Sequence, residues 1–211
     1  MSKFQEWKKE LTGHKKVIFL AALFFMFVLL INFFASNYVD EIPTTPTSDL
    51  VLDHFGPHDW SYVYIYGFVL VLLVFVIHPV LFHVKELHIF LSQFSLLLLI
   101  RSFFISLTHL KVPIDVIAIK VPAIFSFMVA QNDLFFSGHT AFPFLAYLLF
   151  RKEKIGIFFL IATVVMATTV LVMHVHYSID VFAALFITYG SYKIGKWFFN
   201  KIDLKFNDEK N

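Results

Sequence analysis

Long apolar runs separated by short polar connections occupy almost the whole of the 211-residue chain. A helix needs about 20 mostly apolar residues to cross a bilayer, and six runs reach or approach that length. No repeat or flexible linker interrupts them. The pattern therefore predicts an all-α integral membrane protein built as a six-transmembrane-helix bundle. The predicted spans are residues 17–36, 61–83, 87–109, 136–150, 155–174 and 177–198.

Two of the runs depart from a standard span. The fourth is short, and we expect it to gain residues from 131–136. The first follows basic residues, as a signal peptide would, but its apolar stretch is too long and its cleavage signal is weak, so we expect it to stay uncleaved. The expected organisation is a basic N-terminal segment at 1–16, a single membrane domain at 17–198 and a tail at 199–211.

The N-terminal segment places Phe4, Trp7 and Leu11 at helical spacing among lysines. An amphipathic stretch of this kind can lie along the membrane surface. A solvated basic tail explains the same residues equally well, and both interpretations stay open.

The composition agrees with a membrane protein. Hydrophobic residues make up 59% of the chain and charged residues only 15%, against about 25% charged residues in a soluble globular protein. The absence of cysteine excludes disulfides, thiolate catalysis and cysteine-bound metals. We expect no cofactor, metal or nucleic-acid partner.

The distribution of the cations predicts the orientation. Of the 17 Lys and Arg residues, 14 fall on one side of the predicted spans, and the positive-inside rule makes that side cytoplasmic. The opposite side carries the loop 37–60, which has five carboxylates and no Lys or Arg. Both termini are therefore expected in the cytoplasm. The 14 cations are Lys3, Lys8, Lys9, Lys15, Lys16, Lys85, Arg151, Lys152, Lys154, Lys193, Lys196, Lys201, Lys205 and Lys210.

Two histidines begin apolar runs on the side opposite the cations. His176 and Asp180 are four residues apart, so on a helix they would share a face. A carboxylate there can accept a hydrogen bond from one imidazole nitrogen and leave the other free for nucleophilic attack. His139 is the candidate general acid for a departing oxygen. In the alternative interpretation, Asp180 is a structural carboxylate satisfied by a neighbouring helix.

The fourth and sixth runs both present helix N-termini to this side, where unpaired N–H groups favour a phosphate. Ser137 is the predicted N-cap of the fourth, and Gly138 allows close approach of the backbone. We predict an anion cradle there. Arg101, inside the third span, either binds the phosphate or pairs with Asp133 or Asp180. A purely structural ion pair is the alternative.

His174 is a weaker candidate. Two residues turn a helix by about 200°, so His174 and His176 would point roughly apart if both were helical. A metal site formed by this His-x-His pair would need an extended segment instead.

These segments resemble the motifs of the sphingomyelin synthase family, a branch of the type 2 phosphatidic acid phosphatase superfamily. The family's Asp-x-x-x-Ser-Gly-His-Thr segment matches residues 133 and 137–140, and its His-Tyr-Thr/Ser-Ile/Val-Asp-Val segment matches residues 176–181. The preceding His-x-His arrangement matches His174, and a third segment resembles Arg101, Thr108 and Leu110. Gln131 and Asn132 stand where the eukaryotic enzymes have Cys-Gly, so the family's lipid specificity is not carried over.

The resemblance implies a role for each matched residue and separates two branches of the superfamily. His176 would be the nucleophile, Asp180 its orienting partner and His139 the general acid. The phosphatases carry an Arg six residues before the nucleophile, where this chain has Val170, and their Lys-x6-Arg-Pro motif is not found either. Fewer cations favour a phosphodiester donor over a phosphomonoester. The implied substrate-binding residues are Arg101, Asp133, Ser137, Gly138 and Thr140.

The sequence therefore predicts a phospholipid headgroup phosphotransferase that works through a covalent phosphohistidine. The donor would be a glycerophospholipid, and the acceptor a lipid alcohol such as ceramide or diacylglycerol, with phospholipase C activity when water accepts the group. A lipid phosphate phosphatase on the same scaffold and a non-catalytic membrane protein or transporter are the alternatives. The residue bias indicates a bacterial plasma membrane with the site on the outer face, and a homo-oligomer is left open.

Overall fold

The computed structural model describes residues 3–119 and 134–208, and seven α-helices account for most of those ranges. Three short turns join them: η1 (Leu52–His54), the π-helical η2 (Val63–Gly67), which runs straight into α3, and η3 (Val84–Glu86). The α-helices are α1 (Lys3–Gly13), α2 (Lys15–Glu41), α3 (Phe68–Phe82), α4 (Leu87–Leu107), α5 (Gly138–Phe150), α6 (Lys154–Val172) and α7 (Ser178–Asp208).

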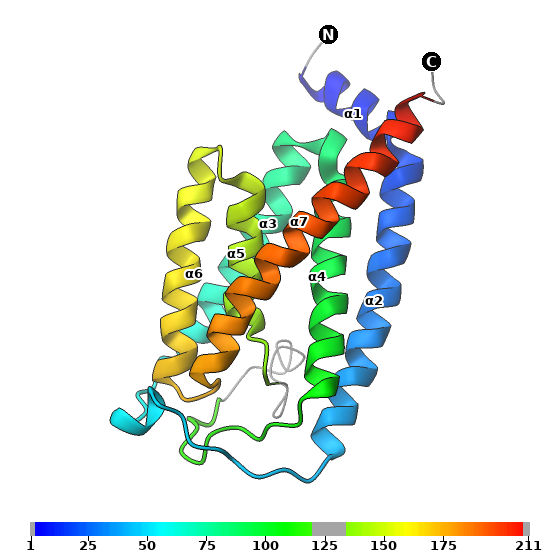
Figure 1. Cartoon of the computed structure of the whole chain (residues 1–211). Helices are drawn as coiled ribbons and strands as arrows, with labels where there is room; N and C mark the ends of the chain where they lie inside the picture. Colours follow the sequence, from blue (N-terminus) through cyan, green and yellow to red (C-terminus); the bar gives the residue numbers. More distant parts are fainter. Residues whose placement is uncertain (1–2, 120–133, 209–211) are drawn as a thin grey trace.

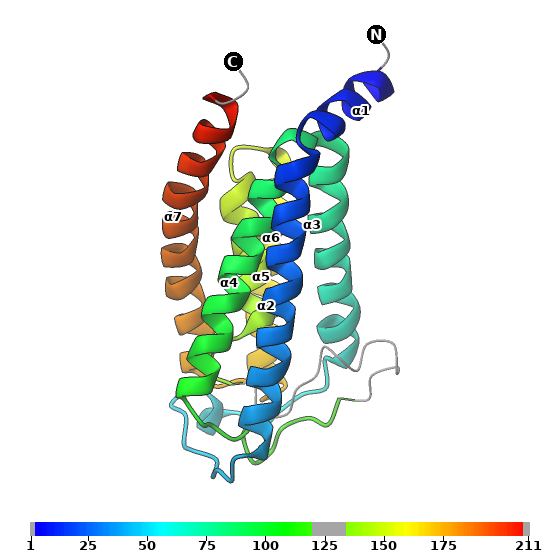
Figure 2. The ribbon, with the colours of Figure 1, turned by 90° about the vertical axis from the view of Figure 1, so that its right-hand side faces the viewer.

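Helices α2 to α7 form one bundle, in which α7 crosses α4 and α5 at a tilt (Figure 1). Both termini lie at the same end of the bundle, together with the α3–α4 and α5–α6 connections (Figure 2). The opposite end carries the α2–α3 and α6–α7 connections and the described parts of the long α4–α5 connection. Successive helices run in opposite directions, so an even number of them returns the chain to the end of the bundle where it started. The assignment of the end with the termini to the cytoplasm rests on charge and stays a prediction.

The helices agree with the predicted runs to within a few residues, apart from longer ends on α2 and α7. Four of them are long and apolar enough to cross a membrane, whereas α5 is a shorter apolar helix and α7 is not among the four. The structure thus supports a helical membrane protein, and the count of six spans stays a prediction. The four candidate spans are Lys15–Glu41, Val63–Phe82, Val84–Leu107 and Lys154–Val172.

The start of α5 differs from the expected one. Residues 134–137 are not helical, so α5 gains nothing from 134–136, and residues 131–133 lie outside the described ranges. Phe135 has a positive φ of 76° and its N–H bonds to Asp180 Oδ1 at 3.0 Å, while the N–H of Ser137 bonds to the C=O of Asp180. These bonds compete with helix formation. Irregular backbone at membrane depth is tolerated where protein groups satisfy it in this way.

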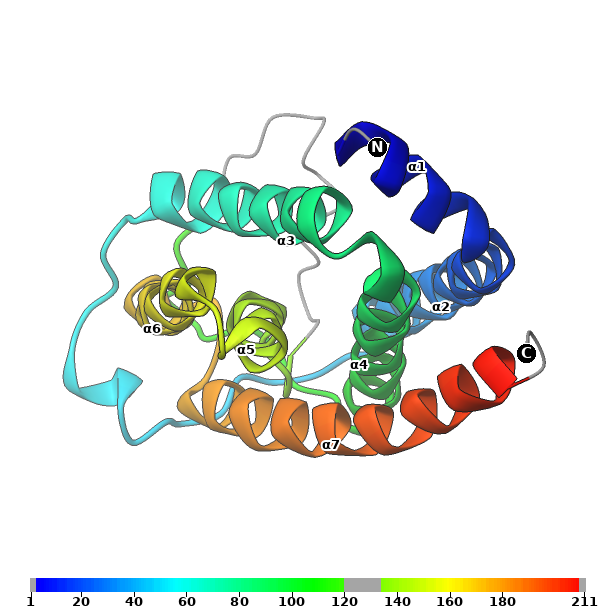
Figure 3. The ribbon, with the colours of Figure 1, turned by 90° about the horizontal axis from the view of Figure 1, so that it is seen from above.

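Helix α5 occupies the middle of the bundle, between α3, α4, α6 and α7 (Figure 3). Its 13 residues span only about 20 Å, but its neighbours enclose it. Ala141 and Ala146 of α5 and Ala184 of α7 are fully buried. Lipid provides no hydrophobic drive for helix association, and small residues of this kind let backbones approach closely.

Helix α1 packs at the end of the bundle with the termini. The Nε1–H of Trp7 donates to the C=O of Val80 at 2.7 Å, and Glu10 lies 3.2 Å from the Lys85 ammonium. Phe4 is 69% exposed. The N-terminal segment is therefore helical and anchored to the α3–α4 connection, whereas its contact with a membrane surface stays a prediction.

The two ends of the bundle give a direct test of topology, because the chain has no cysteine of its own. Ser48 lies in the α2–α3 connection and Lys152 in the α5–α6 connection, and both are exposed. In intact cells, a membrane-impermeant maleimide should label Ser48→Cys and leave Lys152→Cys unlabelled until the cells are opened. Labelling of both variants from the same side would contradict the bundle's placement across the membrane.

Candidate active site

The turn between α6 and α7 holds His176 against Asp180. Nδ1 of His176 lies 2.9 Å from Oδ2 of Asp180, and both side chains are buried. The spacing of the two residues predicts this hydrogen bond, but its setting differs from the expected one. His176 precedes α7, which begins at Ser178, so only Asp180 is helical. The bond holds Nδ1 and leaves Nε2 as the nitrogen suited to nucleophilic attack.

The carboxylate of Asp180 connects three segments. Its Oδ2 accepts the N–H of Tyr177 at 3.1 Å in addition to the His176 bond, and its Oδ1 accepts the N–H of Phe135 at 3.0 Å. The side chain is fully buried. A buried carboxylate is costly unless it is hydrogen-bonded in this way. Asp180 therefore orients His176 and also fixes the backbone that leads into α5.

Helix α6 ends in a turn that carries His174 at a positive φ of 55°. The N–H of Val175 bonds to the C=O of Val170, and the N–H of His174 bonds to the C=O of Leu171. These are the two hydrogen bonds of a Schellman motif. Glycine is usual at that position, although histidine is among the residues that tolerate it. Nδ1 of His174 lies 2.8 Å from Oδ1 of Asp115. Neither His174 nor His176 is helical, and each directs Nδ1 at its own carboxylate, Asp115 and Asp180 respectively.

His139 lies in the first turn of α5 and is only 5% exposed. Its ring stacks against Tyr64 and lies tilted against Phe68, with both centroids 4.0 Å away. Tyr64 belongs to the π-helical turn η2, a distortion that often marks functional positions. His139 also interacts electrostatically with His176 and Arg101. The structure thus brings the two histidines together from distant parts of the chain.

Arg101 of α4 lies against the N-terminus of α5. Its Nε donates to the C=O of Phe136 at 3.2 Å, and one terminal nitrogen donates to Oδ1 of Asn32 at 3.4 Å. A Cβ built on Gly138 would lie 3.4 Å from Arg101 Nε, so the small residue permits this close approach. The predicted pairing of Arg101 with Asp133 stays a prediction, because Asp133 lies outside the described ranges. The guanidinium therefore adds positive charge where the first N–H groups of α5 converge.

Ser137 occupies the N-cap of α5, as its sequence setting predicts, but its side chain does not cap the helix. Its Oγ instead accepts a hydrogen bond from the Thr140 hydroxyl at 3.2 Å. Ser137, Gly138 and Thr140 are all buried. The N–H groups of the first turn are thus not satisfied by this serine, which is compatible with the predicted anion cradle at α5.

The N-terminus of α7 already contacts a protein carboxylate. Oδ2 of Asp49, from the α2–α3 connection, accepts both the N–H of Ser178 at 2.7 Å and its hydroxyl at 2.9 Å. Asp49 Oδ1 accepts the N–H groups of Val51 and Leu52. A protein carboxylate already occupies the N-terminus of α7, which favours negative charge. The first turn of α7 is thus less suited to an anion than the first turn of α5.

Sequence reasoning proposed His139, His176, Asp180 and Arg101, and it did not name the residues that contact them. His139 contacts Tyr64, Arg101 contacts Asn32, and His174 contacts Asp115. In each pair the two residues come from different segments of the chain. Only Asn32 carried a signal, as a polar side chain in the middle of the first apolar run.

A cavity of about 580 Å³ lies at the same end of the bundle. His174 and Tyr177, which flank the nucleophile candidate, form part of its wall, as do Asp53 and Asp115. Carboxylates give this space a negative character.

Residues 132–196 match the family described as PAP2 superfamily C-terminal. The stretch covers less than half of the chain and contains both histidines of the site and Asp180. The match supports the type 2 phosphatidic acid phosphatase superfamily, and with it phosphoryl-transfer or hydrolysis chemistry in the broad sense. It does not distinguish the sphingomyelin synthase branch. No curated protein and no solved structure matches the chain.

The contact of Asp49 with α7 predicts a pH-dependent loss of stability. Burial opposes ionisation, but the hydrogen bonds from Leu52, Ser178 and Val51 outweigh it and hold the pKa of Asp49 below its usual value. Because the folded-state pKa is depressed, the stabilisation is present at neutral pH and is lost as pH falls below about 4. Asn offers one acceptor oxygen for four donors, so Asp49→Asn should cost about 1–2 kcal/mol at pH 7.

Thermal unfolding in detergent measures this effect. The gap in Tm between wild type and Asp49→Asn should narrow as the pH falls through 4. Asp59 is a matched control, because it lies on the same connection and its Oδ1 accepts the N–H of Ser61, a neighbour in the chain, rather than a donor from α7. Asp59→Asn should shift Tm less. Equal shifts in Tm for the two variants would mean that the contact between Asp49 and α7 adds no stability of its own.

Proposed function

We propose that this chain is a phospholipid headgroup phosphotransferase that works through a covalent phosphohistidine at the outer leaflet. The observation that carries the proposal is the buried His176–Asp180 pair, with a second histidine, His139, on the segment whose Phe135 and Ser137 N–H groups bond to Asp180. A nucleophile oriented by a carboxylate and a separate proton carrier are the two parts that transfer through a covalent intermediate needs.

In the first half-reaction, Nε2 of His176 attacks the phosphorus of a glycerophospholipid. The N–P bond forms as the P–O bond to diacylglycerol breaks, and His139 gives its proton to the departing oxygen. Asp180 stabilises the positive charge that develops on the His176 ring. The phosphate oxygens lie against the N-terminus of α5 and the Arg101 guanidinium, where donors face the growing negative charge.

In the second half-reaction, a lipid alcohol takes the group. His139 now removes the proton of the acceptor hydroxyl, the new O–P bond forms, and the N–P bond to His176 breaks. Water as acceptor would turn the same cycle into a phospholipase C reaction. In the described residues, Nε2 of His139 is buried and has no hydrogen-bond partner, so it is free to carry the proton in both directions.

The cations around the site favour a diester donor. Val170, at the position where the phosphatases carry an arginine, is fully buried in an apolar cluster with Tyr64, Ile65 and Met173. Arg101 is the one buried Lys or Arg in the described part of the chain. A phosphomonoester brings about two negative charges and leans on several cations, whereas a diester brings one. A single guanidinium and one helix N-terminus suit the smaller charge.

The cavity beside the site favours a headgroup with positive charge. Asp53 and Asp115 line it, and His174 and Tyr177 connect it to the nucleophile candidate. A cationic substituent on the phosphate would find carboxylates there, and a second negative charge would be repelled.

Replacing Arg101 by Leu tests the phosphate contact. Removal of a buried charge should not impair insertion into the membrane, but activity should fall at least about a hundredfold, equivalent to about 2.7 kcal/mol of transition-state stabilisation. Lys193→Leu, which removes an exposed cation from α7, is the control and should keep near-normal activity. Near-normal activity in Arg101→Leu, at equal protein level, would assign this residue to structure alone.

Two donors with different leaving groups separate the roles of the histidines. Diacylglycerol is a poor leaving group and needs a proton, whereas p-nitrophenolate hardly needs one. His139→Ala should therefore lose headgroup transfer from a labelled glycerophospholipid but keep part of the cleavage of a p-nitrophenyl phosphodiester. His176→Ala should lose both activities, and Asp180→Asn should fall between. His109→Ala, an exposed histidine at the same end, should leave both unchanged.

Several outcomes would overturn parts of the proposal. Equal losses on both donors for His139→Ala would remove the general-acid role, and rescue of His176→Ala by the activated donor would remove the covalent histidine. Phosphate release from phosphatidate, without movement of a headgroup between lipids, would identify a lipid phosphate phosphatase. Absence of every activity in pure, folded protein would favour the non-catalytic alternative.

A further inference from the structure

A second cluster of titratable side chains lies at the end of the bundle that carries the termini (Figure 1). His78 lies in the last turns of α3, His83 follows the last residue of that helix, and Glu153 is the N-cap of α6. No step of the proposed reaction uses these residues, which lie at the end of the bundle opposite His176 and Asp180.

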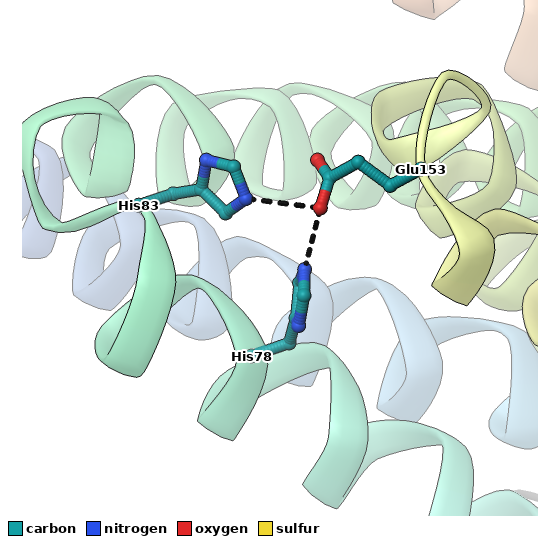
Figure 4. A group of neighbouring side chains, drawn as sticks. All are labelled: His78, His83 and Glu153. Atoms are coloured by element: carbon teal, nitrogen blue, oxygen red, sulfur yellow. Dashed lines mark hydrogen bonds and ion pairs between the residues drawn. The ribbon is translucent and has the colours of Figure 1, made fainter.

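The three side chains converge on one point (Figure 4). Nε2 of His78 lies 3.0 Å from Oε2 of Glu153, and Nε2 of His83 lies 3.1 Å from the same oxygen. All three ligand atoms lie within 4.8 Å of one another. Two imidazoles and one carboxylate directed at a common centre are the donor set of many protein metal sites.

We propose that His78, His83 and Glu153 bind a zinc ion, with water as the fourth ligand. Ligand atoms about 2.1 Å from a tetrahedral zinc ion lie about 3.4 Å from one another. The two nitrogen–oxygen separations are only a few tenths of an ångström shorter than that. A shift of a few tenths of an ångström would bring the ligand atoms to the required separation, and the bound ion would replace the protons that these nitrogens share with the carboxylate.

The surroundings hold the ligands in place. The His78 ring meets the buried Phe150 edge-on at a centroid distance of 4.9 Å, and the His83 ring meets Phe90 in the same way at 5.9 Å. Glu153 lies in a tight turn that depends on Gly156, because a Cβ there would overlap the backbone of Phe150. Ligands whose orientation is already fixed lose little conformational freedom on binding.

The neighbouring cations do not prevent binding. Arg151, Lys152 and Lys154 are exposed, so solvent screens their charge. Lys85 is paired with Glu10 at 3.2 Å. Two neutral imidazoles and one carboxylate leave the bound ion with a single net positive charge.

A bound ion would join the α3–α4 connection to the α5–α6 connection, which are far apart in the sequence. His78 and His83 belong to the turn between α3 and α4, and Glu153 belongs to the turn between α5 and α6. Zinc would tie α3 to the central helix at this end and so stabilise the folded protein by mass action. The ion would take no part in the proposed transfer reaction, because the candidate catalytic histidines lie at the other end.

Zinc titration of the full-length protein in detergent tests the proposal after treatment with EDTA and removal of the chelator. Calorimetry should give one zinc ion per chain, zinc should raise Tm, and cobalt at the same site should give the visible absorption of a four-coordinate ion. His78→Gln, His83→Gln and Glu153→Gln should each weaken zinc binding at least about tenfold, because even loss of an outer-shell partner typically costs about 10–100-fold.

His14 is the matched control, since it is the N-cap residue of α2, near the N-terminus, and lies outside the cluster. His14→Gln should bind zinc as the wild type does. Glu153→Asp, which keeps the carboxylate, should retain more affinity than Glu153→Gln and so separates ligand loss from misfolding. Failure of the wild type to bind zinc, or unchanged affinity in folded Glu153→Gln, would show that the cluster is an ordinary hydrogen-bonded group of two histidines and a glutamate.

Discussion

The buried carboxylate of Asp180 is the constraint on which the rest of this site depends. Removing an ion from water costs several kcal/mol even after the protein relaxes. Here the cost is offset by three hydrogen bonds, from the imidazole of His176 and from the N–H groups of Tyr177 and Phe135. Any replacement of Asp180 would leave buried donors without an acceptor. One side chain therefore determines the position of the candidate nucleophile and the course of the chain into α5.

The short central helix follows from the same constraint. Residues 134–137 direct backbone N–H groups at Asp180, and Phe136 offers its C=O to Arg101, so these residues cannot also continue α5 toward its N-terminus. Lipid could not satisfy irregular backbone of this kind, but the surrounding helices do. As a result, α5 is shorter than the other apolar helices, and its N-terminus lies inside the protein beside the Arg101 guanidinium and His139.

Hydropathy predicted the helices because an apolar run is a local property of the chain, and the His176–Asp180 bond was predictable because four residues separate the pair. The supporting contacts were not, because each joins segments far apart in sequence. Asp49 reaches α7 across 129 positions, and Asn32 reaches Arg101 across 69. No pattern in the sequence indicates that Asp49 already occupies the N-terminus of α7.

Polar contacts between helices have a particular importance in such a bundle. Apolar side chains gain little by leaving lipid for protein, so close packing and interhelical hydrogen bonds must specify which helices pair. Asn32 links α2 to α4 through Arg101 and Ser102, and Gln93 links α4 to α7 through the C=O of Tyr192. The first of these links also orients the guanidinium beside α5. The contact that joins α2 to α4 and the contact that orients the Arg101 guanidinium are therefore the same, and a substitution at Asn32 would alter both at once.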